Sequence, residues 1–197
     1  MPHEKPSRSY SPVAKPKRAA REPLPAPIDV RYRGRKMESI AHDGQIYASS
    51  LTIAACEDCA VVVPCVIGKA ELADCKRCVV VLGPTRDRVT MRDCYDCTLV
   101  TWSASVHVID CVGTRLAASV SAGGEVKCEG GKPTATARAM DVEYDALEKQ
   151  LAQAGLGEHS IVFTNEHACG ETAYEMLTGK KPSIVGVETP LRRARAT

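Results

Sequence analysis

The sequence predicts a mainly β fold, in which short parallel strands stack into a solenoid (a parallel β-helix). The stretches "ACEDCAVVV", "DCKRCVVVL" and "DCYDCTLV" each place a Cys-x-x-Cys pair directly before an apolar run. The first cysteines of these units, followed by Cys111, recur at steps of 19, 19 and 17 residues. Within each run the apolar residues alternate with a period of two, which is typical of strands with one buried face. One such unit cannot bury its own face, but three or more stacked units build a continuous core.

When the units are aligned on their first cysteine, each aligned position (a column) holds residues of one kind. Neighbouring units are expected to stack about 4.8 Å apart, the ordinary spacing between strands. The two cysteines of a unit lie three residues apart, so the chain must bend between them if both point inward. The predicted inward columns are Leu51, Ala70, Val89 and Val106; Ile53, Leu72, Met91 and Val108; Cys56, Cys75, Cys94 and Cys111; Cys59, Cys78, Cys97 and Thr114; and Val61, Val80, Leu99 and Leu116.

The N-terminal segment differs from the rest in composition. Residues 1–27 hold seven of the twelve prolines, and residues 1–36 hold ten Lys or Arg against three acids. Such a segment offers little to a core, so residues 1–36 are expected to form an extended basic arm without regular structure. The solenoid is then expected over residues 37–138. The remaining residues, 139–197, are expected to form a small α/β extension with a basic tail.

The extension carries recognisable helix and strand signals. Its first helix is expected to begin at about Asp141, a plausible N-cap, and to end at Gly155. A short strand at 160–165, a second helix at 166–177 and a final strand at 182–188 follow from the same reasoning.

The composition excludes several protein classes. No apolar run reaches the eighteen residues that a membrane span needs, and no secretory signal begins the chain. The expected location is therefore the cytoplasm, where ten cysteines should be mostly reduced. No cofactor and no membrane contact are expected. A nucleic-acid partner is not expected either, because no aromatic platform accompanies the basic arm.

The cysteines allow a metal site as well as a structural role. Cys56, Cys59, Cys75 and Cys78 match the zinc spacing C-x2-C-x15-C-x2-C. Against zinc, the pairs are followed by apolar runs, and the fourth unit replaces its second cysteine by Thr114. Reduced cysteine behaves as a small buried hydrophobe. We therefore favour structural core cysteines over zinc or a redox dithiol, at Cys56, Cys59, Cys75, Cys78, Cys94, Cys97 and Cys111.

The repeated units "ADCKRCVVVLG" and "RDCYDCTLV", preceded by "VIGKAEL", resemble the tubulin-binding cofactor C domain. The wider superfamily includes the C-terminal domain of cyclase-associated protein. The resemblance implies a right-handed parallel β-helix, a cytosolic location and cytoskeletal clients, which are tubulin or Arf-like GTPases in cofactor C-type members and actin in cyclase-associated proteins.

Some cofactor C-type members accelerate GTP hydrolysis with the arginine of a Gln-x-Arg motif. Alignment on "RDC" puts Arg88 at the glutamine position and Thr90 at the arginine position. Arg88, Thr90 and Arg92 alternate onto one outward face, so Arg88 and Arg92 are the only candidates to substitute. A shift of two residues moves the guanidinium by about 7 Å, whereas an arginine finger needs close geometry. The resemblance therefore favours a protein that is not an enzyme.

Two functions from different classes remain open. The first is a non-enzymatic scaffold of the cytoskeleton that binds microtubules as part of a larger assembly, for example in a cilium or flagellum. Its basic residues suit an acidic polymer. The second is a GTPase-activating or folding cofactor for tubulin or an Arf-like GTPase, or an actin-monomer binder. The predicted binding residues of the arm are Lys15, Lys17, Arg18, Arg21, Arg31, Arg33, Arg35 and Lys36.

Overall fold

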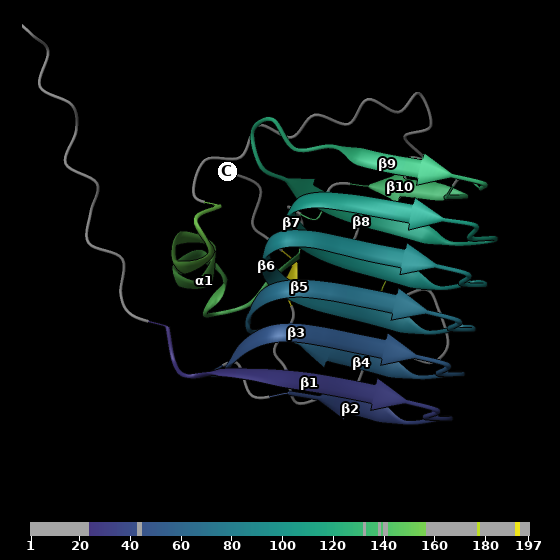
Figure 1. Ribbon diagram of the computed structural model, residues 1–197, viewed down its shortest axis with the longest axis horizontal. Helices are drawn as coiled ribbons and strands as arrows, with labels where there is room; N and C mark the ends of the chain where they lie inside the picture. Colours follow the sequence, from purple (N-terminus) through teal and green to yellow (C-terminus); the bar gives the residue numbers. More distant parts are fainter. Residues whose placement is uncertain are drawn as a thin grey trace, which may run out of the picture.

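The chain winds into a β-solenoid of about five turns, which confirms the predicted fold class. The computed structural model describes residues 24–42, 45–131, 133–137, 139, 142–156, 177 and 192–193. Each rung runs along one face, turns a sharp corner and returns along a second face (Figure 1). Face A holds β1 (Pro27–Arg33), β3 (Tyr47–Ala54), β5 (Val66–Ala73), the second halves of β6 (Val79–Arg92) and β7 (Thr98–Ile109), and β9 (Val126–Glu129). Face B holds β2 (Ser39–Ala41), β4 (Ala60–Val63), the first halves of β6 and β7, β8 (Arg115–Val120) and β10 (Ala135–Ala137).

The strands of each face pair in parallel and in register, so equivalent residues stack directly. Leu51 pairs with Ala70, which pairs with Val89, which pairs with Val106. These side chains and the neighbouring inward column lie in one core cluster at 0–4% exposure. The period of two therefore sorts each face A strand into a buried apolar row and an outward polar row.

The corners explain the Asp-Cys-x-x-Cys pattern. Each of the first five corners contains two residues in the left-handed backbone region, such as Asp74 and Arg77, whose φ angles are 54° and 49°. Asp and Gly tolerate this region better than most residues. Asp93 and Asp110 occupy the first position of their corners, and Gly34 and Gly130 hold it in the terminal rungs. The two left-handed residues turn the chain so that both cysteines of the pair face the core.

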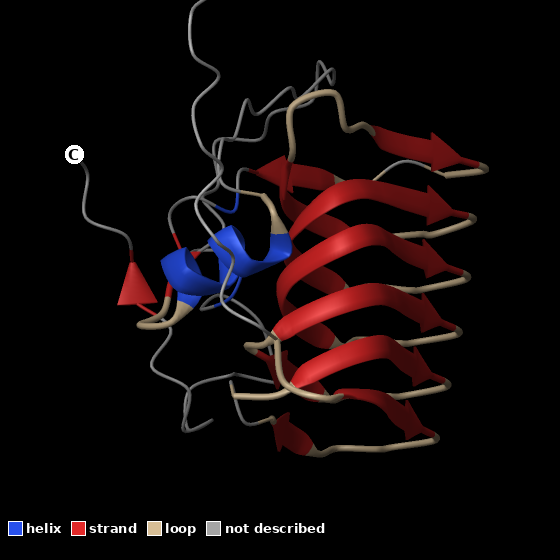
Figure 2. Ribbon diagram, turned by 60° about the vertical axis from the view of Figure 1, so that its left-hand side comes forward, coloured by secondary structure: helices blue, strands red, loops and turns tan. Residues whose placement is uncertain are grey.

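The C-terminal extension covers face B. Its helix α1 (Leu147–Ala154) lies at the end of the rungs away from the corners (Figures 1 and 2). A second apolar cluster joins this extension to outward residues of face B, at Val62, Val79, Val81, Val100, Trp102 and Ala117 on the solenoid and at Ala139, Val142, Tyr144, Leu147 and Leu177 on the extension. Strands β4 and β6 thus bury side chains on both surfaces, which accounts for their unbroken valine runs.

The predicted boundary of the N-terminal arm is wrong. Residues 27–33 form β1, and the bridge at Lys36 adds the first corner, so the solenoid begins about ten residues earlier than expected. Val30 and Tyr32 supply the inward positions that cap the core below Leu51 and Ile53. The corner of this rung lacks cysteines, which is why the repeat did not reveal it. Residues 1–23 lie outside the described part of the chain, so the remainder of the arm stays a prediction.

The extension differs from its prediction at the start of the helix. Val142–Glu143 form the short strand β11, which pairs antiparallel with β12 (Arg192–Arg193), and α1 begins only at Leu147. The predicted end at Gly155 is confirmed, since this glycine adopts the left-handed conformation with φ 78° and caps the helix. The expected N-cap Asp141 and the elements expected at 160–165, 166–177 and 182–188 fall outside the described residues, apart from the helical Leu177.

Candidate functional site: the outward surface of face A

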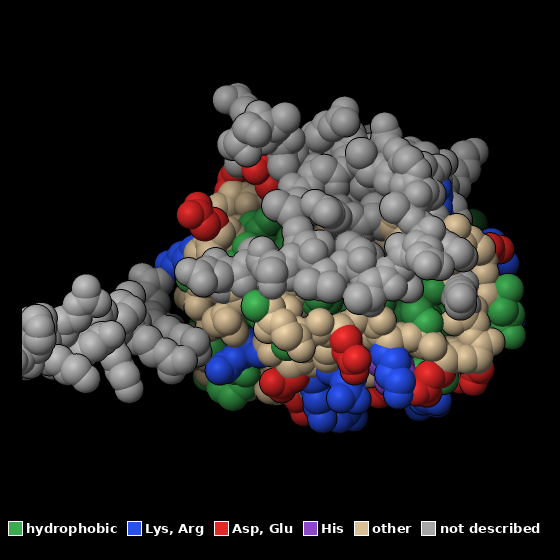
Figure 3. All heavy atoms as spheres, turned by 90° about the horizontal axis from the view of Figure 1, so that it is seen from above, with side chains coloured by type: hydrophobic (Ala, Val, Ile, Leu, Met, Phe, Trp, Pro, Cys, Tyr) green, Lys and Arg blue, Asp and Glu red, His purple; other side chains and the backbone are tan. Residues whose placement is uncertain are grey.

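Face A differs from face B in what covers it. Among the described residues, the extension reaches face A at the start of its strands, where Ala154 and Leu156 cluster with Val66 and Tyr47. Beyond this point the outward rows are polar along most of their length. In Figure 3, which views the molecule from above, Lys, Arg, Asp and Glu side chains gather along the lower edge of the picture, where face A lies. The outward rows are Asp29, Ser50, Lys69, Arg88 and Ser105; Arg31, Thr52, Glu71, Thr90, His107 and Lys127; and Arg33, Ala54, Ala73, Arg92, Ile109 and Glu129.

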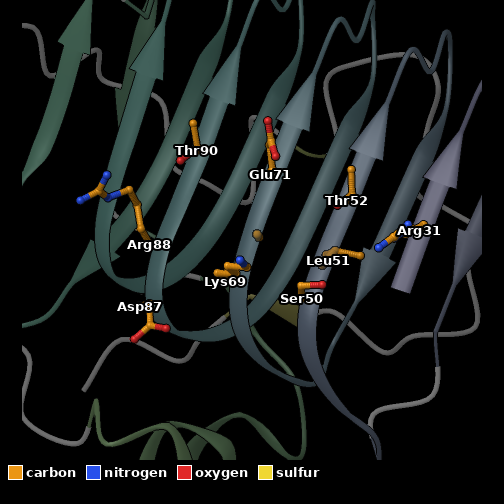
Figure 4. Close-up of a pocket in the computed structure, with 10 residues that line it drawn as sticks. Arg31, Ser50, Leu51, Thr52, Lys69, Glu71, Asp87, Arg88 and Thr90 are labelled. Carbon is orange, nitrogen blue, oxygen red and sulfur yellow. The ribbon is translucent and has the colours of Figure 1, made fainter. Parts of the chain in front are cut away.

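A shallow groove of about 670 Å³ crosses the first four rungs of this face. Arg31, Lys69 and Arg88 bring three cations to it, and Thr52 and Thr90 lie to one side of them, further along the strands (Figure 4). Two carboxylates, Glu71 and Asp87, also line it. The strand register therefore gathers residues that are 57 positions apart in the chain into one surface.

The structure separates the two arginines that the sequence left as candidates. Arg92 Nε donates to Glu71 Oε1 at 2.9 Å, and its Nη1 lies 3.8 Å from Asp93. This bond to Glu71 raises the pKa of Arg92 above its usual value. Arg88 is exposed and makes no ion pair with any described residue. Arg88 is thus available to a partner, whereas Arg92 is already engaged.

The predicted binding residues of the N-terminal segment fall in different environments. Arg31 and Arg33 point outward from β1, and both are exposed. Arg35 pairs with Glu38 at 3.6 Å, and Lys36 pairs with Glu57 at 3.2 Å. The structure therefore brings Arg31 into the groove, while Arg35 and Lys36 lie at the first corner. Lys15, Lys17, Arg18 and Arg21 fall outside the described residues.

The corners form a second charged surface, in which several of the charges pair with one another. Arg77 donates to Asp58 and to Glu57, each at 2.7 Å. Hydrogen bonds from Arg77 lower the pKa of both carboxyl groups. Further along the same ridge, Tyr95 and Val112 are exposed apolar neighbours. The remaining exposed charges of the ridge without an ion pair to a described residue are mostly acidic, at Asp74, Asp96 and Asp110, whereas those of the groove are mostly basic.

The seven cysteines of the corners lie in the core at 0–1% exposure. Each thiol donates to the carbonyl oxygen two residues before it, at 3.2–3.5 Å, as Cys75 does to Ala73 and Cys78 to Lys76. Burial raises the pKa of the Cys56 thiol, and the neighbouring Cys78 thiol raises that of Cys97 to about 12, whereas the hydrogen bond with the Cys94 thiol lowers the pKa of Cys111 to about 7. A metal ligand or nucleophile needs the thiolate, which the raised pKa values of Cys56 and Cys97 disfavour. Within the described ranges, no three His, Cys, Asp or Glu side chains are arranged to hold a metal ion.

The sequence reasoning missed Lys69 and did not separate Arg88 from Arg92. The signal for Lys69 was present, because it occupies the same outward column as Arg88 one unit earlier. The pairing of Arg92 depends on Glu71, which lies on the neighbouring strand two positions away from the register partner of Arg92. Alignment of the outward residues of successive units would have indicated both the position of Lys69 in the groove and the pairing of Arg92 with Glu71.

Comparisons with known proteins bear on the family of the chain. No helix among the described residues is long and apolar enough to cross a membrane. A comparison with curated proteins gives no match. The family model described as tubulin binding cofactor C matches residues 48–166, which is more than half of the chain and includes the four cysteine corners. The chain therefore belongs to the tubulin binding cofactor C family.

Proposed function

We propose that this protein is a non-enzymatic, microtubule-binding scaffold of the cytoskeleton that contacts tubulin through the outward surface of face A. Membership of the tubulin binding cofactor C family supports tubulin as the partner. The observation that carries the proposal is the groove with Arg31, Lys69 and Arg88, three exposed cations without an ion pair to any described residue. Microtubule surfaces are acidic, so these cations complement them.

The basic residues before β1 extend the same proposal. Lys15, Lys17, Arg18 and Arg21 precede the strand that carries Arg31, and they add four positive charges within seven residues. Exposed charges of this kind are screened beyond about 10 Å at 0.1 M salt. Binding to an acidic polymer through the arm and the groove should accordingly weaken steeply as salt is raised.

Parallel co-sedimentation with microtubules and with actin filaments tests the choice of partner. We expect the full chain to pellet with microtubules at low salt and to remain in the supernatant with actin. Release of the protein from microtubules at about 1 M salt, where the Debye length is about 3 Å, supports an electrostatic contact. Pelleting with actin alone would contradict the proposal and favour the actin-binding branch of the superfamily.

A second candidate function is stimulation of GTP hydrolysis by tubulin or an Arf-like GTPase. One observation favours it, namely that the Arg88 guanidinium is exposed and unpaired among the described residues. An arginine finger raises the rate of hydrolysis by about 10³–10⁵-fold. If the second candidate is correct, Arg88→Ala abolishes stimulated hydrolysis while Arg92→Ala, which removes an arginine already bound by Glu71, has a smaller effect. The scaffold proposal predicts no stimulation by the wild type.

The location within the cell follows from the partner. We propose a cytoplasmic protein of the cytoskeleton, and an axonemal position in a cilium or flagellum stays a prediction. Immunofluorescence of the tagged full chain beside a microtubule marker tests both. Staining along axonemes supports the narrower location, whereas staining of cytoplasmic microtubules alone contradicts it.

A further inference from the structure

The long axis of the groove on face A runs across the rungs, at right angles to the strands. Arg31 belongs to the first rung, Lys69 to the third and Arg88 to the fourth. Rungs stack about 4.8 Å apart, so the outer two cations are separated by three rung steps, about 14 Å. An extended peptide covers that distance with four to five residues at about 3.3 Å each. Figure 4 shows the three side chains spread along the groove rather than converging on one point.

The charges around the groove leave a net positive strip. Glu71 is neutralised by its bond to Arg92 at 2.9 Å. Asp29 does not line the groove, and hydrogen bonds from Ser49 and Ser50 hold its carboxylate at 2.7 Å. Asp87 is exposed and makes no ion pair with the described residues, so among the acids that line the groove it is the one that would repel an anion. Asp29, just outside the lining, adds a second negative charge, because the hydrogen bonds from Ser49 and Ser50 and the nearby charges of Arg31 and Lys69 lower the pKa of its carboxyl group.

We propose that this groove binds an extended acidic peptide segment of the protein partner, laid across the rungs with its carboxylates over Arg31, Lys69 and Arg88. The inference rests on the proposed function and names the part of the partner that face A would hold. The Thr52 and Thr90 hydroxyls lie beside the path and are placed to hydrogen-bond such a segment. A single phosphate fits less well, because the strand amides of face A are used in ladder bonds and no backbone nest gathers the three cations.

Fluorescence anisotropy with a labelled hexaglutamate peptide tests the proposal on the full chain. We expect binding at about 0.1 M salt and its loss at about 1 M salt, where exposed charges are screened. Hexaglutamine should not bind. Each of Arg31→Ala, Lys69→Ala and Arg88→Ala should weaken binding about 2- to 5-fold, and the triple variant about 10- to 100-fold. Asp87→Asn should tighten binding by a similar factor, because it removes the unpaired negative charge that lines the groove.

Matched control variants separate the groove from general surface charge. Arg86 is exposed two residues from Arg88 but does not line the groove, and Lys76 is an exposed lysine at a corner. We expect Arg86→Ala and Lys76→Ala to leave peptide affinity unchanged. Equal losses in the control and groove variants would overturn the proposal, as would displacement of the peptide by tripolyphosphate at a much lower concentration than by unlabelled hexaglutamate.

Failure of this inference is distinguishable from failure of the proposed function. If the groove variants weaken hexaglutamate binding but the wild type does not pellet with microtubules, the acidic-peptide site stands and tubulin is the wrong partner. If the wild type pellets with microtubules but hexaglutamate binds with the same affinity to wild type and triple variant, the peptide site is refuted and the scaffold proposal survives.

Discussion

Two buried hydrogen bonds made by Gln150 of α1 give the sharpest test of how the extension covers face B. Gln150 is 3% exposed and donates from Nε2 to the Pro64 carbonyl at 2.8 Å. The Tyr144 hydroxyl, on a residue that is 5% exposed, donates to Gln150 Oε1 at 2.6 Å. Gln150→Leu therefore removes the partners of two buried polar groups at once.

The magnitude follows from those two groups. A buried donor or acceptor that loses its partner costs about 1–3 kcal/mol, so Gln150→Leu should lower the free energy of unfolding by about 2–5 kcal/mol. The double variant Tyr144→Phe/Gln150→Leu removes the stranded Tyr144 hydroxyl, while the Pro64 carbonyl still lacks the donor that Gln150 supplied. It should consequently be about 1–3 kcal/mol more stable than Gln150→Leu alone. Glu148→Gln, an exposed change on the same helix, should stay within about 0.5 kcal/mol of the wild type.

The chain has one tryptophan, Trp102, and it reports directly on this interface. Trp102 is 3% exposed and packs edge-on against Tyr144, with the ring centroids 6.1 Å apart. Urea unfolding followed by tryptophan emission and by circular dichroism gives the free energies of all four proteins. The reasoning is refuted if Gln150→Leu is as stable as the wild type, or if the double variant is less stable than Gln150→Leu.

Four further predictions concern the solenoid and its surroundings. Cys75→Ser should cost about 1–3 kcal/mol in urea unfolding, because it buries a hydroxyl in an apolar core, and Cys75→Ala should be milder; stoichiometric zinc in elemental analysis of the wild type would contradict the structural role of this cysteine column. Gly83→Ala should cost at least about 1–3 kcal/mol in the same assay, because the added Cβ would lie 2.3 Å from the Cys65 carbonyl oxygen of the rung below, and a neutral effect would contradict the stacking. Burial raises the pKa of Tyr144, so the folded state keeps a proton that the unfolded state loses above about pH 10. The Tm should therefore fall as pH rises past about 10, and it should fall less in Tyr144→Phe. Deletion of residues 1–23 should leave Tm unchanged, since no described core column draws on them, whereas deletion of residues 1–36 also removes β1 and should lower it.

The solenoid was predictable because its core repeats the same chemistry in the same column. Leu51 and its equivalents are apolar in four consecutive units, and each pair of cysteines marks a corner at a fixed place in its unit. The first rung was not predictable in this way. Gly34 and Met37 take the left-handed positions there without any cysteine beside them, so only the alternation of Val30 and Tyr32 indicated a strand within a basic, proline-rich segment.

The candidate site was predictable only in part. Alternation put Arg88 and Arg92 on one outward face, but the choice between them depends on the ion pair with Glu71 on the neighbouring strand. The covering of face B had a signal in the valine run of β4, whose residues are buried on both sides. The valine run does not show that the C-terminal extension is the element that covers face B, because this depends on where α1 packs on the solenoid.

The central claim is that the outward surface of face A, through Arg31, Lys69 and Arg88, makes the contact with tubulin. The most direct measurement is microtubule co-sedimentation of the triple charge reversal Arg31→Glu/Lys69→Glu/Arg88→Glu, with the corner variant Lys76→Glu as control and with circular dichroism to verify folding. We predict that the triple variant stays in the supernatant while Lys76→Glu pellets like the wild type. A folded triple variant that pellets with undiminished affinity would contradict the claim and place the contact elsewhere on the chain.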